Sequence, residues 1–318
     1  MLLTGGLGGA HLAPTLAEVL GEQNLAVVVN VGDDLDWHGL RVCPDLDTVL
    51  YALGGHLDRE RGWGRVGDTF TTTDALASLR EAVWFSVGDR DLATHLVRSQ
   101  LLATGRSLTE VTAELAARLG AGEVTVLPAS DQPCATRLEL RDGDRVDFQQ
   151  WYVRDRAEPA VSAVLPGRGS AAPSVLAALN AAGAVVIGPS NPLTSIGTIL
   201  ALNGMPEAVA KVPVRLALSP VVVRAAEPSA AVAHHTRARR LLLASLGEVD
   251  SPAGVAAYYA RRHPGLVTTF LLDYRDQVEA AEVAHHGLRP VPTDLLDPKE
   301  LAKTLVSLLR DEALSPSA

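Results

Sequence analysis

The sequence contains only two cysteines, Cys43 and Cys134, among its 318 residues. They lie far apart and form no CxxC motif, which excludes a disulfide framework and a zinc site built from thiolates. A chain of this length can bury a core that is stable without such cross-links. Because this cysteine usage is typical of a reducing compartment, we expect the protein to be cytoplasmic.

The chain also lacks an excess of positive charge and a long apolar run. Its 28 lysines and arginines are outnumbered by 37 aspartates and glutamates, and the net charge of −9 offers no surface for nucleic acid. No apolar run approaches the roughly 18 residues that span a bilayer, and MLLTGGLGG lacks the basic start of a signal peptide. We expect a soluble protein that binds neither nucleic acid nor membranes, and that binds any nucleotide as a small molecule.

Short apolar runs alternate with segments of helical periodicity. The runs are LLT, LAVVVN, AGAVVIG, VRLALSPVVV and LVTTFLL. This alternation predicts an α/β fold, namely a Rossmann-like, open, mainly parallel sheet with helices on both faces. Two helix starts are marked clearly, by the capping box SLTE at residues 107–110 and by DPKE at residues 297–300.

Two segments interrupt this rhythm. Residues 136–153 predict an antiparallel hairpin that turns at Asp142-Gly143. We expect it to belong to an insertion of about residues 52–172 that covers the site, in a chain that is otherwise one domain over residues 1–318. The Ala/Arg-rich residues 224–247 predict a loop and then a solvated helix without a catalytic role. Its histidines are adjacent, so they face different sides of the helix and make a poor metal pair.

The loop GGLGGAH, residues 5–11, follows the first apolar run and opens a helix. Backbone N–H groups at such a helix start can hold a phosphate. The dinucleotide fingerprint fails, because His11 stands where the third glycine or alanine belongs and the second apolar run ends in Asn30 instead of an acid. NAD and FAD are therefore disfavoured, and a tight turn without a ligand is the alternative. The glycines predicted to bind are Gly6, Gly8 and Gly9.

A second loop, GPSNPLTSIGTIL at residues 188–200, also follows an apolar run and leads into a helix. Pro189 and Pro192 stiffen it. Because both loops would lie at the carboxyl edge of a parallel sheet, where ligands bind at the switch point, they could share one ligand. The residues of this loop that we expect to bind substrate are Ser190, Asn191 and Ser195.

Charged residues mark two further helix starts. PDLDTVLY, residues 44–51, carries Asp45 and Asp47 in its first turn, where they could simply cap the helix. Alternatively, they could hold a hard cation such as Mg²⁺ or accept a proton from a hydroxyl group. GDRDLATH, residues 88–95, presents Arg90, whose guanidinium could bind a phosphate with two hydrogen bonds or form a local salt-bridged cap. The aspartates at positions 33, 34 and 36 are predicted to shape their loop and not to catalyse.

Five motifs, in this order, resemble the 2-phospho-L-lactate transferases of coenzyme F-420 biosynthesis: GGLGGAH, NVGDD, CPDLDTVLY, GDRDLATHLVRSQ and GPSNPLTSIG. They are most similar to the actinobacterial branch, the phosphoenolpyruvate transferases. The likeness runs from Met1 to about Pro220 and includes LPASDQP at residues 127–133 and DFQQWYVR at residues 147–154.

The resemblance implies transfer of a phospholactyl or phosphoenolpyruvyl group from a guanosine-diphosphate donor to the ribityl hydroxyl of the deazaflavin Fo. GMP would leave, and (dehydro) coenzyme F-420-0 would form. The resemblance also implies Mg²⁺ as cofactor and a homodimer. It places Asp47 and Arg90 at the deazaflavin, with Asp47 as the candidate base, and Asp45 and Asp47 at the metal. The two loops and Asn30 would bind the donor.

Three positions depart from the family pattern. His11 stands where relatives commonly have lysine or arginine, Thr198 replaces a proline, and residues 221–235 replace a glycine-rich continuation. The strongest alternative function is a nucleotide-sugar-binding regulatory protein of the same fold, without turnover. A nicotinamide-dependent oxidoreductase is weaker, because of Asn30.

Overall fold

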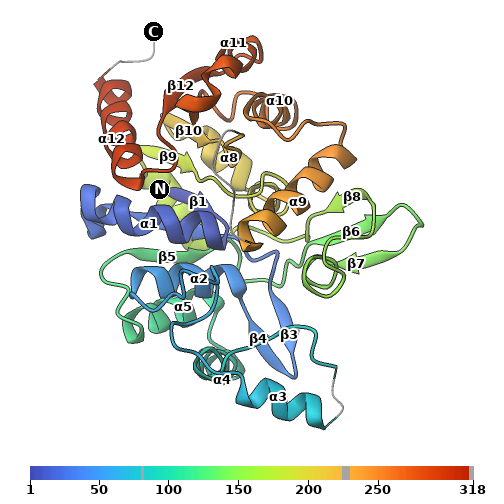
Figure 1. Cartoon of the computed structure of the whole chain (residues 1–318). Coiled ribbons are helices and arrows are strands. Elements are labelled where there is room, and N and C mark those ends of the chain that lie inside the picture. Colours follow the sequence, from blue (N-terminus) through green and yellow to red (C-terminus); the bar gives the residue numbers. More distant parts are fainter. Residues whose placement is uncertain (80–81, 224–229, 315–318) are drawn as a thin grey trace.

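The computed structural model describes residues 1–79, 82–223 and 230–314 of the chain (Figure 1). Its strands are β1 (Leu2–Thr4), β2 (Ala26–Val29), β3 (Leu35–Trp37), β4 (Leu40–Val42), β5 (Thr125–Pro128), β6 (Arg137–Leu140), β7 (Arg145–Asp147), β8 (Val161–Leu165), β9 (Ala184–Ile187), β10 (Val214–Leu218), β11 (Thr269–Asp273) and β12 (Arg289–Thr293). Seven of them form one parallel sheet in the order β12-β11-β10-β9-β1-β2-β5. The sequence prediction of a Rossmann-like, parallel α/β fold is confirmed.

Helices surround this sheet. They are α1 (Gly6–Leu20), α2 (Pro44–Leu53), α3 (Thr71–Ser78), α4 (Asp89–Ala103), α5 (Leu108–Arg118), α6 (Pro173–Ala181), α7 (Ile196–Leu200), α8 (Met205–Ala210), α9 (Ala230–Ser245), α10 (Pro252–Arg262), α11 (Ala280–His285) and α12 (Pro298–Leu314), with the short turns η1 (Glu22–Asn24), η2 (Gln150–Arg154) and η3 (Tyr274–Glu279). Helix α1 packs against α2 and α12, whereas α6 packs against α8 and β5. In the described part of the chain, no helix has the length and apolarity needed to cross a membrane.

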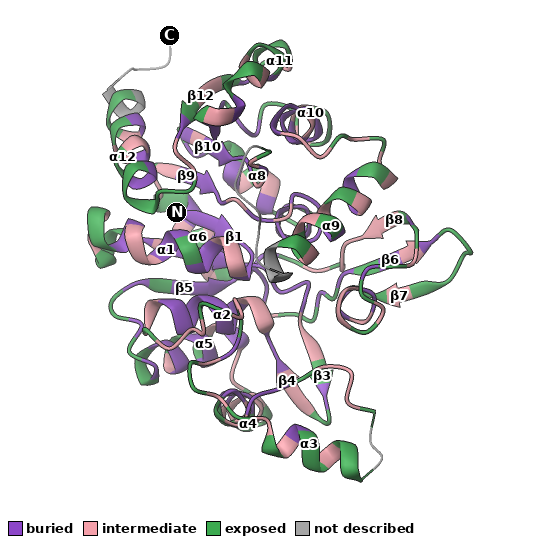
Figure 2. Cartoon of the chain, viewed as in Figure 1, coloured by how far each residue is buried: buried purple, intermediate pink, exposed green. Residues whose placement is uncertain are grey.

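The central strands are short apolar runs because helices cover them. Strands β1 and β11 are buried along their whole length, and β2 and β9 are buried except at their first residue (Figure 2). A parallel sheet covered in this way selects continuous apolar runs instead of an alternating pattern. Its two edge strands carry the prolines: Pro128 ends β5, and β12 contains Pro290 and Pro292. Edge positions tolerate proline because one side of the strand has no ladder to complete.

The chain leaves β1 in two directions. It first builds β2 and β5 on one side, and later places β9 on the other side. The carboxyl ends of β1 and β9 therefore form the switch point of the sheet, where open α/β folds bind ligands. The loops at residues 5–11 and 188–200 begin there, as the sequence predicts.

A smaller antiparallel sheet, β7-β6-β8, contains the predicted hairpin. Its turn includes Gly143, whose φ of 97° favours glycine. The predicted insertion at residues 52–172, however, is not one continuous piece, because it contains α5 and the strand β5 of the main sheet. Strand β5 was missed because it is short and lies at an edge.

Both predicted helix starts are confirmed. Ser107 and Glu110 form a reciprocal capping box at α5. At α12 the Asp297 carboxylate accepts hydrogen bonds from the amides of Lys299 and Glu300. These bonds satisfy N–H groups that have no partner inside the helix.

Gly9 allows α1 to pack closely on its neighbours. A Cβ atom there would lie 2.6 Å from Thr4 Cγ2 and 2.9 Å from Val49 Cγ2. Both neighbours belong to buried elements, so neither has free space into which to move. The glycine is therefore required for the contact of α1 with β1 and α2.

Substitution Gly9→Val should lower the free energy of unfolding by about 1–3 kcal/mol, because the added methyl groups overpack a filled core. Urea denaturation measures the change. Gly183→Ala is the matched control, since a Cβ at Gly183 meets no atom within 4 Å. Equal midpoints for the two variants would contradict the packing argument.

Candidate active site

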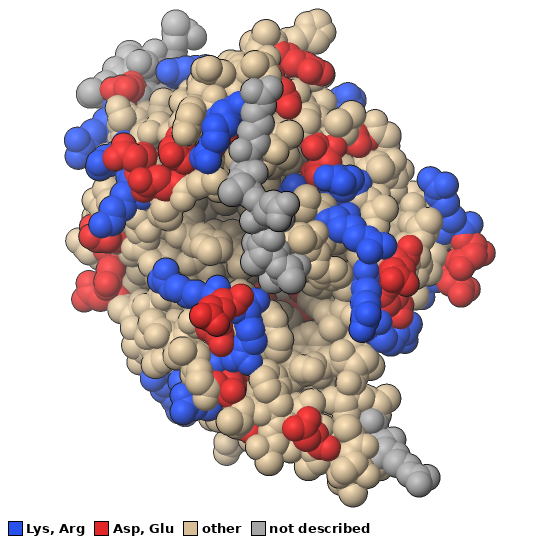
Figure 3. Space-filling view, viewed as in Figure 1, with Lys and Arg blue, Asp and Glu red and all other residues tan. Residues whose placement is uncertain are grey.

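A cavity of about 1080 Å³ opens at the switch point. The space-filling view shows the hollow on this face, with charged side chains around its rim (Figure 3). Both predicted loops, α2, η2 and α9 contribute to its lining. Pockets for one small ligand typically measure about 300–1,000 Å³, so the cavity is large enough for a ligand of nucleotide size.

The two strand-end loops touch each other. The amide of Gly5 donates to Ser190 Oγ at 2.9 Å, and the hydroxyl groups of Thr4 and Ser190 lie 3.0 Å apart. A Cβ atom at Gly8 would collide with Ser190 Oγ, so the close approach of the loops requires glycine there. The first turn of α1 and the second loop therefore form one continuous wall.

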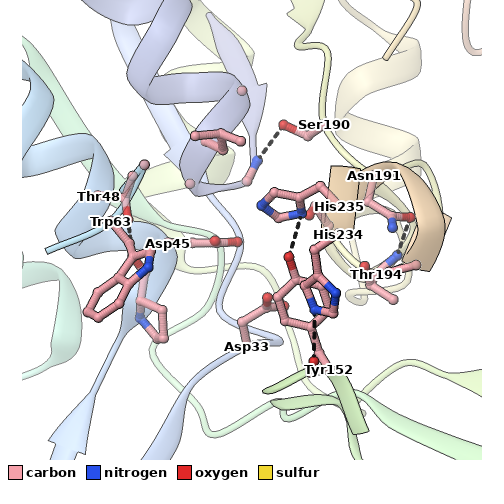
Figure 4. A pocket seen from close by; sticks show the side chains of 18 of the residues that line it. Asp33, Asp45, Thr48, Trp63, Tyr152, Ser190, Asn191, Thr194, His234 and His235 are labelled. Carbon is pink, nitrogen blue, oxygen red and sulfur yellow. Dashed lines mark hydrogen bonds between the residues drawn. The ribbon is translucent and has the colours of Figure 1, made fainter. Parts of the chain in front are cut away.

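Two carboxylates, from Asp33 and Asp45, meet beside this wall (Figure 4). The Asn30 side-chain amide donates to Asp33 Oδ1 at 2.8 Å and to Asp45 Oδ2 at 2.9 Å. The backbone N–H of Gly6 also donates to Asp45. Burial, and then the neighbouring Asp45 carboxylate, raises the pKa of Asp33 well above its usual value. Burial likewise raises the pKa of Asp45 to about 6.

The Asp33–Asp45 pair fits a hard divalent cation. Carboxylate oxygens are the preferred ligands of Mg²⁺, which binds proteins through one or two carboxylates and keeps the rest of its shell for substrate and water. A buried carboxylate, Asp33, beside a half-buried one, Asp45, is unfavourable while both are charged, until a cation neutralises them. Asp33, which the sequence assigns only to loop shaping, lines the cavity.

Asp47 belongs to a different network. Both terminal nitrogens of Arg98 donate to its carboxylate, one of them at 3.0 Å, and His95 Nδ1 lies 3.5 Å away. Burial by itself lowers the pKa of Arg98, but the Asp47 carboxylate raises it above the usual value. In this fully charged, buried pair Asp47 lines the cavity with its orientation fixed.

The ligand atoms of Asp47, Asp91 and His95 lie within 4.8 Å of one another. Arg98, however, already neutralises Asp47, and Tyr51 donates to Asp91 at 2.6 Å. A guanidinium inside such a group repels a cation, so these residues fit a hydrogen-bond network better than a metal site. The sequence predicts Asp45 and Asp47 as metal ligands; in the structure, Asp45 has Asp33 as its carboxylate partner.

Other predicted site residues are divided between the cavity and its surroundings. The ones that line the cavity are Gly6, Gly8, Ser190, Asn191 and Ser195. Asn30 lies behind it and holds the two carboxylates. Gly9 packs against the core. Arg90 is exposed, donates to the Val66 carbonyl at 3.0 Å and does not line the cavity, so its placement does not support the predicted contact with substrate.

Several residues that line or support the cavity are not predicted by any local sequence pattern above. Asp91, His95 and Arg98 lie on one face of α4 at helical spacing, a pattern present in GDRDLATHLVRSQ. Tyr152 and His235 come from distant segments, η2 and α9, and no local signal joins them. Residues 224–229 lie outside the described part of the chain, but the helix that follows them lines the cavity, in contrast to the predicted solvated helix.

Aromatic side chains line the cavity. They include Trp63, Trp84 and Phe85, and Phe148 stacks on Tyr152 with ring centroids 5.4 Å apart. Such surfaces can stack on a planar ring system. His11 also lines the cavity, and burial, followed by Arg59, lowers its pKa. With histidine instead of lysine or arginine at position 11, the cavity has a neutral ring there and not a permanent positive charge.

The fold and the cavity define a Rossmann-like α/β protein with a large cavity at the switch point of its sheet. The family model for 2-phospho-L-lactate transferase CofD matches residues 1–312, and the chain belongs to this family of transferases. It is 40% identical over 308 residues to a phosphoenolpyruvate transferase of Streptomyces griseus, with 93% of each chain covered. A phosphoenolpyruvate transferase of Kitasatospora aureofaciens is 41% identical over 323 residues, with 96% of each chain covered.

A solved structure supports the fold alone. A member of the UPF0052 family from Bacillus halodurans superposes with a TM-score of 0.64 at 15% identity, covering 96% of this chain and 97% of the other. Family membership thus makes the protein an enzyme of the transferase class. Its fold is shared with proteins outside that group of relatives.

The raised pKa of Asp45 predicts a dependence of stability on pH. Between about pH 4 and pH 6 the folded state holds a proton that the unfolded chain releases, so stability falls as pH rises through this window. Relative to Asp45→Asn, the wild-type free energy of unfolding should fall by on the order of 1–3 kcal/mol from pH 4 to pH 7 without metal. Urea denaturation at several pH values tests this.

Addition of Mg²⁺ at pH 7 should stabilise the wild-type protein more than Asp45→Asn, because the cation replaces the missing proton. Parallel pH curves for the two proteins, or equal stabilisation by Mg²⁺, would contradict the assignment.

Proposed function

We propose that the protein transfers a phosphoenolpyruvyl or phospholactyl group from a guanosine-diphosphate donor to the ribityl hydroxyl of the deazaflavin Fo. GMP leaves, and (dehydro) coenzyme F-420-0 forms. The observation that carries this proposal is the Asp33–Asp45 pair, held against the first turn of α1 at the switch point. Family membership and the names of the curated relatives support the class of group transferred.

The donor's phosphates would lie along the wall that the first turn of α1 and the second loop form together. The N-terminus of α1 attracts negative charge, and Ser190, Asn191 and Ser195 bring hydroxyl and amide groups to the same wall. Asp33 and Asp45 would hold Mg²⁺, which neutralises charge on the phosphate oxygens. Phosphoryl transfer depends mainly on such positioning and charge neutralisation.

The acceptor would lie on the side of α2, with its planar ring against the aromatic side chains. Its hydroxyl oxygen attacks the outer phosphorus of the donor, a new P–O bond forms, and the bond to the GMP oxygen breaks. Asp47 orients the hydroxyl and accepts its proton. Arg98 prevents the Asp47 carboxylate from turning away, because it holds both carboxylate oxygens.

Incubation of the purified protein with Fo, Mg²⁺ and either guanosine-diphosphate donor should release GMP. The acceptor should gain one phospho-acyl unit by mass spectrometry. If GMP appears with neither donor, the transferase proposal fails. Tight binding of a uridine-diphosphate sugar without turnover would instead favour a regulatory protein.

Substitution Asp47→Asn should reduce turnover by roughly 10²-fold or more, because general-base catalysis contributes about 10²–10⁴-fold. GMP release under saturating substrates measures it. Asp36→Asn is the control, since the side chain of Asp36 is 72% exposed on the neighbouring hairpin. An unchanged rate in Asp47→Asn would leave this residue with a structural role only.

A further inference from the structure

Helix α9 contributes two histidines to the cavity, and both meet Tyr152 of η2. His235 Nδ1 lies 3.0 Å from the Tyr152 hydroxyl. His234 Nε2 lies 3.0 Å from the Tyr152 carbonyl oxygen, and its ring packs on the tyrosine ring at 4.4 Å between centroids. The two histidines therefore have different roles. His234 connects α9 to the backbone of η2, whereas His235 forms a hydrogen bond with the Tyr152 hydroxyl, which faces the cavity.

The bond between Tyr152 and His235 sets which nitrogen of His235 carries a proton. Burial, followed by the carboxylates of Asp33 and Asp45, raises the pKa of Tyr152, so the hydroxyl keeps its proton. Within the described residues His235 Nδ1 is the hydrogen-bond partner of this hydroxyl. Tyr152 therefore donates to Nδ1, and the remaining proton of a neutral imidazole resides on Nε2.

His235 is neutral in this setting. Its side chain is exposed within the cavity, but the surrounding protein desolvates the ring, and this effect, followed by His234 and Arg239, lowers its pKa to about 4. Arg239 and Arg240 of α9 both face Asp250, which accepts a hydrogen bond from Arg239 at 2.7 Å. His235 can therefore donate a hydrogen bond without adding charge.

The second ring nitrogen points into the cavity. In Figure 4 the ring of His235 lies between Ser190 and the Tyr152 hydroxyl, and the ring edge opposite the hydroxyl is turned toward the space in front of Asp45. Among the described residues, His235 Nε2 has no hydrogen-bond partner. The His235 ring is held in place through Nδ1, and its Nε2–H group lies beside the proposed phosphate wall and the Asp33–Asp45 pair. A donor in this position is suited to an anionic oxygen.

We propose that His235 Nε2–H donates a hydrogen bond to a phosphate oxygen of the nucleoside-diphosphate donor, and that Tyr152 is the positioning residue that fixes this tautomer. The assignment rests on the proposed function for the identity of the ligand. It gives α9, whose sequence departs from the family pattern, a direct part in donor recognition.

Calorimetric binding of GDP in the presence of Mg²⁺ tests the assignment without turnover. His235→Phe should weaken GDP binding by about 10-fold or more, since a hydrogen bond to a charged group contributes roughly 1.5–3 kcal/mol. His235→Gln, which keeps an N–H donor, should restore much of the affinity. Tyr152→Phe should weaken binding less than His235→Phe, because it frees the tautomer without removing the donor.

Guanosine and Arg237→Gln are the controls. Guanosine lacks phosphate, so its affinity should be the same in wild type and His235→Phe. Arg237 is exposed on α9 and does not line the cavity, so Arg237→Gln should bind GDP normally. Equal GDP affinity in wild type and His235→Phe, or an equal loss of guanosine and GDP, would overturn the proposal, as would a wild-type protein that does not bind GDP.

The two proposals can fail separately. A wild-type protein that binds GDP through His235 but releases no GMP from either donor would refute the transfer reaction and leave the assignment of His235 in place. A wild-type protein that transfers the group, with a donor KM unchanged in His235→Phe, would refute the assignment of His235 alone.

Discussion

Two neighbouring carboxylates, the buried Asp33 and the half-buried Asp45, share one amide, and the site depends on this constraint. Asp33 and Asp45 both accept hydrogen bonds from Asn30, and Asp45 also accepts from Gly6. Asn30 follows β2, Asp45 begins α2, and Gly6 begins α1, so three elements converge on one pair of charges. Buried like charges are tolerated only where hydrogen bonds, protons or a cation compensate them.

The negative charge of Asp47, further along α2, is compensated in a different way. Asp47 has a permanent cation, Arg98, as its ion-pair partner. Helix α2 therefore starts with two carboxylates in different surroundings: Asp45 lies beside the Asp33 carboxylate, whereas Asp47 faces a guanidinium. This separation suits a reaction in which one group binds the charged donor and another orients a neutral hydroxyl.

The walls of the cavity come from segments that are remote in sequence. Helix α1 and the second loop meet because β1 and β9 are neighbours, although about 180 residues separate them. Helix α9 contacts Tyr152 of η2 at the cavity, and the small sheet β7-β6-β8 supports η2. The segment after Pro220 therefore contributes to the cavity itself and not only to the surface.

The sequence by itself determined the parallel α/β fold, the helix caps and the two strand-end loops, because apolar periodicity and capping chemistry are local properties. It also drew attention to Asp45 and Asp47. Only the tertiary structure decided that Asp33 is the partner of Asp45, that Arg98 holds Asp47, that Arg90 turns to solvent and that His235 faces the cavity. Those outcomes depend on which side chains meet across strands and helices far apart in the chain, and on how deeply each charge is buried, neither of which a local pattern specifies.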